Sequence, residues 1–112
     1  ERIQQAVAQL QQQGVAFDAL FAASDLMAMT AVSALRQHGR RVPEDVRVVG
    51  YDDIALAEHF HPALSTVRQP MAEAGQALVQ ALLAQLAGER VHSIQLPTTL
   101  VVRASSGAAP AA

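Results

Sequence analysis

One run of the sequence, residues 48–53, constrains the fold more than any other: an apolar, β-branched start leads directly into Asp52 and Asp53. Such a run is typical of a buried strand in an α/β sheet. An earlier apolar run, residues 19–23, is followed closely by Asp25. Ligands of open α/β sheets bind outside the carboxyl ends of the strands. The two runs therefore predict a binding crevice with acids from two strand ends at one rim.

Helical and extended patterns alternate along the chain. The periodicity of apolar residues predicts helices over residues 2–13, about 25–38 and 72–87, and a helical turn over 54–58. Extended segments are expected over residues 19–23, 46–51, 65–68 and 94–103. This alternation predicts an α/β fold with a mostly parallel sheet that has too few strands to be complete.

Length and composition describe one small globular domain. The chain has 112 residues, of which 51% are hydrophobic and 16% charged, and these proportions exclude a disordered chain. No apolar stretch reaches the roughly 18 positions that suggest a membrane span. No charged and apolar leader opens the sequence. The absence of cysteine excludes disulfides and thiolate metal sites.

The charges exclude several functions. The net charge is −2, and Arg40 and Arg41 form the only adjacent pair of cations. The chain therefore lacks the clustered cations that nucleic-acid binding requires. It contains no lysine, which excludes a P-loop phosphate site and Schiff-base chemistry.

The polar residues do not form a metal or catalytic pattern. His59 and His61 have the spacing of metal ligands, but Phe60 and Pro62 share their loop, with no cysteine or paired acid in register. No serine stands between the glycines of a nucleophile elbow. We therefore expect no metal, no cofactor and no enzymatic activity.

Four segments carry a family resemblance: residues 21–28, 42–46, 48–53 and 64–70. In order and spacing they resemble the C-terminal part of the effector-binding core of lactose-repressor (LacI/GalR) family transcription regulators. The resemblance extends from about residue 18 to residue 103, nearly the whole chain. Because four separate motifs agree, it is far more specific than a single short pattern.

That resemblance implies a partial doubly wound parallel sheet of the periplasmic-binding-protein-like (type I) architecture. In the family, two subdomains are joined by three crossovers. Residues 1–70 would then form the second half of the C-terminal subdomain, residues 71–93 a crossover and a helix of the N-terminal subdomain, and residues 94–104 the final strand. Residues 105–112 are expected to form a disordered tail, because they are small residues and proline.

Five residues match ligand-binding positions of the family: Ser24, Asp25, Asp52, Gln69 and Met71. From the residues alone, Asp52 equally suits a turn cap, the pair Ser24 and Asp25 favours a helix cap, and Met71 suits packing at a helix entry. The resemblance favours ligand contact for Asp52, because a carboxylate accepts hydrogen bonds from vicinal hydroxyls or a ring N–H; the acid after it is expected to satisfy the local backbone. The resemblance also places a ligand contact at Ser24, with Asp25 as a cap or a support, and places Gln69 and Met71 at a crossover in the cleft.

The helix expected after Ser24 is apolar on nearly every side. One face would pack on the sheet, and the remainder implies a second covered surface. In the family, this helix and the segment after the two acids form the dimer face, which would place Met29 and Phe60 in the interface. The ordinary alternative is that both side chains belong to the core.

The resemblance implies the effector-binding and dimerisation portion of a cytoplasmic, bacterial transcription regulator, either a repressor or an activator. The effector would be a sugar or another small polar metabolite. A homodimer would relay closure of the cleft allosterically to N-terminal DNA-binding heads, absent from this chain, that bind operator DNA. The alternative is a periplasmic sugar-binding protein of a transport system, and a sugar-processing α/β enzyme is a more distant possibility. No contact with a membrane is expected.

Overall fold

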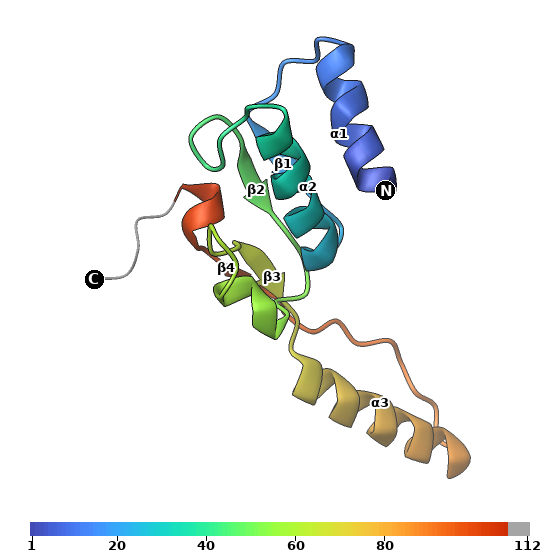
Figure 1. Ribbon diagram of the computed structural model, residues 1–112. Coiled ribbons are helices and arrows are strands. Elements are labelled where there is room, and N and C mark those ends of the chain that lie inside the picture. The colour runs from blue at the N-terminus through green and yellow to red at the C-terminus, as the bar shows by residue number, and fades with distance from the viewer. Residues whose placement is uncertain (108–112) are drawn as a thin grey trace. The chain divides into compact units, whose positions relative to one another are not determined.

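The computed structural model describes residues 1–107, which divide into two compact units (Figure 1). The first unit contains Glu1–Arg68 and the segment that begins at Leu100. The second unit contains Gln69–Thr99. Within residues 1–107, none of the helices combines the length and apolar character that a bilayer crossing requires.

Two helices of the first unit, α1 (Arg2–Gln12) and α2 (Asp25–Gln37), pack side by side (Figure 1). Both were predicted from apolar periodicity. Each is followed by a glycine with a left-handed backbone, Gly14 at φ 66° and Gly39 at φ 74°, a conformation that residues with a Cβ adopt only at a cost. These glycines therefore end the helices where the sequence pattern predicts.

The strands of the first unit are short and parallel where their pairing is defined. β1 (Ala19–Phe21) pairs in parallel with β2 (Arg47–Val49). Isolated parallel bridges, including one between Asp52 and Arg68, connect the end of β2 and the turn after it to the region of β3 (Thr66–Arg68). β3 pairs with β4 (Thr99–Val101). The predicted α/β fold with a parallel sheet is confirmed, although every strand is shorter than its apolar run.

The core of the first unit lies between α2 and the β1–β2 sheet. The face of α2 predicted to pack on the sheet is fully buried at Ala28, Ala31, Val32 and Leu35. Val48 of β2 is fully buried as well. Burial of a valine or leucine side chain contributes roughly 1.5–3 kcal/mol, so Val32, Leu35 and Val48 make a large apolar contribution to folding of the unit.

Two short 3-10 helices complete the first unit, η1 (Ala55–Glu58) and η2 (Ala104–Ser106). The prediction of a disordered tail from residue 105 is wrong for residues 105–107. Ser105 is fully buried, and its Oγ donates a hydrogen bond of 2.6 Å to the Val48 carbonyl and accepts one of 2.8 Å from the Ser65 amide. A small polar side chain thus satisfies backbone groups inside the unit, which composition alone does not reveal. Residues 108–112 lie outside the described residues.

The second unit consists of α3 (Met71–Leu86) and an extended return segment. The helix was predicted over residues 72–87. None of its residues is buried, and its apolar side chains Leu78, Leu82 and Leu86 are 72%, 55% and 76% exposed. Described by itself, the second unit therefore lacks a core, in contrast to the first.

Replacement of Gly50 by alanine is expected to destabilise the first unit. A Cβ at this position would overlap the Asp25 carboxylate and lie 3.1 Å from Cδ2 of Leu64. Overpacking of this kind costs about 1–3 kcal/mol. We expect urea unfolding to show a loss of that size for Gly50→Ala. Gly75→Ala is the matched control, because nothing lies within 4 Å of that position in α3. Equal stability of the two variants would contradict the argument.

Candidate ligand-binding site

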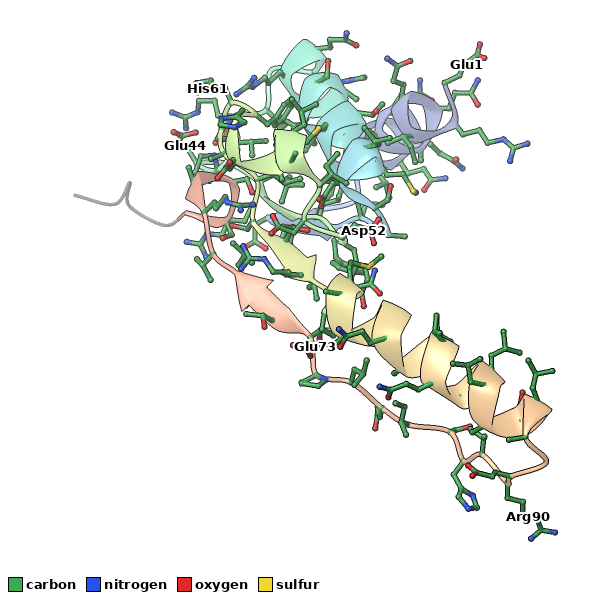
Figure 2. All side chains as sticks on the ribbon, turned by 90° about the horizontal axis from the view of Figure 1, so that it is seen from below. Glu1, Glu44, Asp52, His61, Glu73 and Arg90 are labelled. Carbon is green, nitrogen blue, oxygen red and sulfur yellow. The ribbon has the colours of Figure 1, made fainter. Side chains whose placement is uncertain are left out.

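The candidate site is built on a turn that follows β2. Asp52, which is labelled in Figure 2, has φ 118°, and Asp53 has φ 55°. Consecutive positive φ angles at residues with a Cβ are strained, and such strain is concentrated at functional sites. The Asp52 amide donates a hydrogen bond of 2.9 Å to the Val67 carbonyl, while the residue is exposed. The turn therefore holds an acid at the surface, beyond the end of β2, whose central residue Val48 is buried.

A second acid, Asp25, supports this turn from within the unit. It is fully buried. Its Oδ2 accepts a hydrogen bond of 2.8 Å from the Ile54 amide, and its Oδ1 accepts one of 2.6 Å from the Thr66 hydroxyl. Its own amide donates to the Tyr51 carbonyl at 3.0 Å. Asp25 thus binds the backbone on both sides of the Asp52–Asp53 turn and joins it to β3.

Ser24 takes the capping role that the sequence allowed for either Ser24 or Asp25. Its Oγ accepts a hydrogen bond of 3.2 Å from the Met27 amide at the start of α2. Both carboxylate oxygens of Asp25 are engaged inside the unit, a geometry that favours a supporting role over direct contact with a ligand. Ser24 is half-buried and remains near the surface of the same unit.

Asp53 forms two ion pairs instead of only satisfying the local backbone. Its Oδ2 lies 2.7 Å from Nε of Arg68, and its Oδ1 lies 2.9 Å from Nη1 of Arg103. Partial burial by itself raises the pKa of this carboxyl, but hydrogen bonds from Arg68 and Arg103 outweigh it and hold the pKa below the ordinary value of 3.8. Asp53 therefore stays ionised as the centre of a three-residue cluster.

The two remaining predicted ligand residues belong to the second unit. Gln69 is its first residue, and its carbonyl accepts a hydrogen bond of 2.9 Å from the Met71 amide. Met71 opens α3 with an exposed side chain. It lines a shallow groove on this helix together with Gly75 and Val79. The first unit thus brings Ser24, Asp25 and Asp52 together at the ends of β1 and β2, and the other two residues stand at the start of the second unit.

The two predicted interface residues differ in burial. Met29 is only 7% exposed and belongs to the core cluster of its own unit. Phe60 is half-buried and lines a shallow hollow with Ser33, Arg36 and Gln37 of α2. The large apolar side chains that α2 does expose are Leu26 and Met27.

Sequence reasoning missed Thr66, Arg68 and Arg103 as site residues. Thr66 reads as an ordinary β-branched strand residue, and its hydroxyl gives no periodic signal. Arg103 lies 50 positions from Asp53 in the sequence, so no local spacing indicates their contact. Within residues 1–107, the structure contains no group of three or more histidine, cysteine, aspartate or glutamate side chains that could hold a metal ion.

Comparisons with known proteins identify the family of the chain. The periplasmic binding protein-like domain family matches residues 1–106. The chain is 48% identical over 90 residues to the HTH-type transcriptional regulator CelR of Thermobifida fusca, covering 79% of this chain and 26% of that protein. It is 42% identical over 89 residues to the ribose operon repressor of Haemophilus influenzae, covering 78% of this chain and 27% of that protein. The chain thus spans about a quarter of the length of these relatives.

Solved structures show the same similarity. A complex of the transcriptional regulator CelR with cellobiose superposes with a TM-score of 0.82 at 43% identity, over 94% of this chain and 32% of that one. A lac repressor dimer bound to operator and the anti-inducer ONPF gives a TM-score of 0.86 at 36% identity, over 95% of this chain and 37% of that one.

Removal of the Thr66 hydroxyl is expected to destabilise the first unit. Thr66→Val leaves the buried Oδ1 of Asp25 without its donor, and an unsatisfied buried group costs about 1–3 kcal/mol. Thr30→Val is the matched control, because the Thr30 hydroxyl donates only to the Leu26 carbonyl within α2. Chemical denaturation should show a clear loss for Thr66→Val and a smaller change for Thr30→Val. A loss no larger than that of the control would refute the role given to this hydroxyl.

The Asp53 cluster predicts a pH-dependent contribution to stability. Because the native pKa of Asp53 is below 3.8, its ion pairs stabilise the fold above that pH, and this stability is lost as the pH falls through the native pKa. We expect the free energy of unfolding of wild type to exceed that of Asp53→Asn by about 1–3 kcal/mol at neutral pH. Denaturation at decreasing pH should show this difference shrinking below 3.8. The difference in free energy of unfolding between wild type and Thr30→Val should stay constant over the same pH range, because this substitution alters no ionisable group. A pH-independent difference for Asp53→Asn would contradict the assignment.

Proposed function

The chain belongs to the periplasmic-binding-protein-like domain family, and from this premise we propose that it forms the effector-binding and dimerisation portion of a lactose-repressor family transcription regulator. It corresponds to the C-terminal part of the effector-binding core of such regulators. The observation that carries this proposal is the strained turn that exposes Asp52 beyond β2 while Asp25 supports it from within. The DNA-binding head and the remainder of the effector-binding core would lie in parts of the protein outside this chain.

We propose that Asp52 contacts the effector directly. A carboxylate accepts two hydrogen bonds from vicinal hydroxyls, and hydrogen bonds to a charged group contribute about 1.5–3 kcal/mol each. Ser24 would add a polar contact from the start of α2. We propose Gln69 and Met71 as further ligand contacts because they match ligand-binding positions of the family, with Met71 offering an apolar surface. Asp25 would position the turn.

The proposed effector is a sugar or another small polar metabolite. Two relatives support a sugar, one solved with cellobiose and one named for the ribose operon. The acid and hydroxyl groups at the strand ends of this chain suit a ligand with several hydroxyls. The named relatives are transcription regulators, which favours this function over the alternative of a transport receptor.

Regulation would proceed through closure of the effector-binding cleft of the full-length protein when effector binds. Such a hinge-type transition links effector affinity and operator affinity reciprocally. This chain carries a net charge of −2, so operator DNA would be bound by the N-terminal head and not by the chain itself. A regulator that acts on operator DNA would work in the cytoplasm.

We propose a homodimer that uses the α2 side of the first unit. Phe60 and the hollow beside it, with the exposed Leu26 and Met27, provide apolar surface there. The lac repressor solved on its operator is a dimer. Met29 would contribute mainly by supporting this surface from the core, because its side chain is almost fully buried.

Replacement of Asp52 by asparagine in the full-length protein should weaken binding of the effector without unfolding the protein. The substitution removes the charge that strengthens hydrogen bonds to the ligand, and the exposed side chain contributes little to packing. Titration calorimetry against a panel of mono- and disaccharides that includes cellobiose and ribose identifies a sugar bound by wild type. We expect at least about a tenfold loss of affinity for that sugar, the equivalent of 1.4 kcal/mol.

Glu44→Gln, a neutralised acid in the loop between α2 and β2, is the matched control and should bind like wild type. Wild-type affinity in Asp52→Asn would overturn the role assigned to Asp52.

A further inference from the structure

Asp53 is the centre of an ion cluster that the proposed ligand contacts do not use. Its side chain is 10% exposed and meets Nε of Arg68 at 2.7 Å and Nη1 of Arg103 at 2.9 Å. Each of its oxygens therefore accepts a short, charge-assisted hydrogen bond from a different strand region. Such bonds are roughly twice as strong as neutral ones and are directional.

Both arginines stand where the chain passes between the two units. Arg68 is the last residue of the first unit before the chain enters the second unit at Gln69. Arg103 follows shortly after the chain returns to the first unit at Leu100. One carboxylate of the first unit thus holds the outgoing and the returning connections at the same point.

Arg103 is fixed from several directions. Its Nη1 also donates a hydrogen bond of 2.9 Å to the Leu64 carbonyl, and its amide donates one of 2.7 Å to Oγ of Ser65. Arg103 is 16% exposed at its side chain, whereas Arg68 is 56% exposed. The returning connection is therefore held rigidly, and the outgoing connection can respond more freely to a displacement of Asp53.

We propose that Asp53 is a positioning residue that couples effector occupancy at Asp52 to the two chain connections, through Arg68 and Arg103. This inference rests on the proposed effector site. Asp52 and Asp53 share one peptide bond, and both have a positive φ. A change in the backbone of Asp52 when its carboxylate binds a ligand rotates that shared peptide and displaces the Asp53 side chain.

Coupling requires that a small displacement at Asp53 reaches β3, which ends at Arg68, and the segment after β4 that contains Arg103. The Asp53 amide donates to the Thr66 hydroxyl at 3.3 Å, and the Asp52 amide donates to the Val67 carbonyl at 2.9 Å. The turn and β3 therefore move together. The alternative is that the cluster only stabilises the unit, in which case its removal lowers stability and leaves the response of the connections to ligand unchanged.

Hydrogen exchange of the full-length protein separates these roles. The ligand is the sugar that wild type binds in the panel of mono- and disaccharides, used at saturating concentration so that a moderate change of affinity has no effect. The variants are Asp53→Asn and Arg68→Gln, with Arg68→Lys to restore the charge. Arg41→Gln is the matched control, because it breaks an arginine–aspartate pair with Asp45 at 3.0 Å in a loop without a role in the site.

Wild type and Arg41→Gln should gain sugar-induced protection at the amides of β3 and β4 as well as at the Asp52 turn. In Asp53→Asn we expect the gain to be lost at β3 and β4, because both ion pairs are removed. In Arg68→Gln we expect the gain to be lost at β3 only, with partial recovery in Arg68→Lys, and in every variant it should be kept at the turn. The exposed Arg68 side chain makes its variant safe for folding even if Asp53→Asn fails to fold. Unchanged protection of β3 in Arg68→Gln would overturn the coupling role while leaving the effector site intact. Absence of sugar binding by wild type would overturn the proposed function and this inference with it.

Discussion

The buried carboxylate of Asp25 is the constraint on which the candidate site depends. A carboxylate without hydrogen-bond partners in the interior is very unfavourable, so its surroundings must supply donors. The Ile54 amide and the Thr66 hydroxyl do so, and the Asp25 amide donates in turn to Tyr51. These bonds join the start of α2 to the turn after β2 and to β3. They also explain Gly50, since a Cβ there would overlap the carboxylate.

Two neighbouring acids in the turn have different tasks because their surroundings differ. Asp52 is exposed in a strained backbone, the arrangement that suits a ligand contact. Asp53 is mostly buried and forms ion pairs with two arginines, an arrangement that suits a structural link between the turn and other segments. In our proposal, the pair of acids at this strand end thus divides into one group that would contact the effector and one that connects the turn to the rest of the chain.

The two units differ in how much of their stability lies within the chain. The first buries an aliphatic core against α2, whereas α3 of the second buries none of its residues. Exposed leucines along a helix are unfavourable in water and are typical of a surface that another protein segment covers. This agrees with the finding that the chain spans about a quarter of its relatives CelR and the ribose operon repressor.

The sequence by itself determined the features that depend on neighbours a few positions apart. Apolar periodicity predicted the three helices, and β-branched runs predicted strands followed by acids. Only the tertiary structure decided which acid is buried, which is exposed and which pairs with arginine. Those outcomes depend on contacts across long separations, such as Asp53 with Arg103 at 50 positions and Ser105 with Val48 at 57. Local sequence patterns do not reveal such partners, because these residues come within hydrogen-bond distance only when the chain is folded.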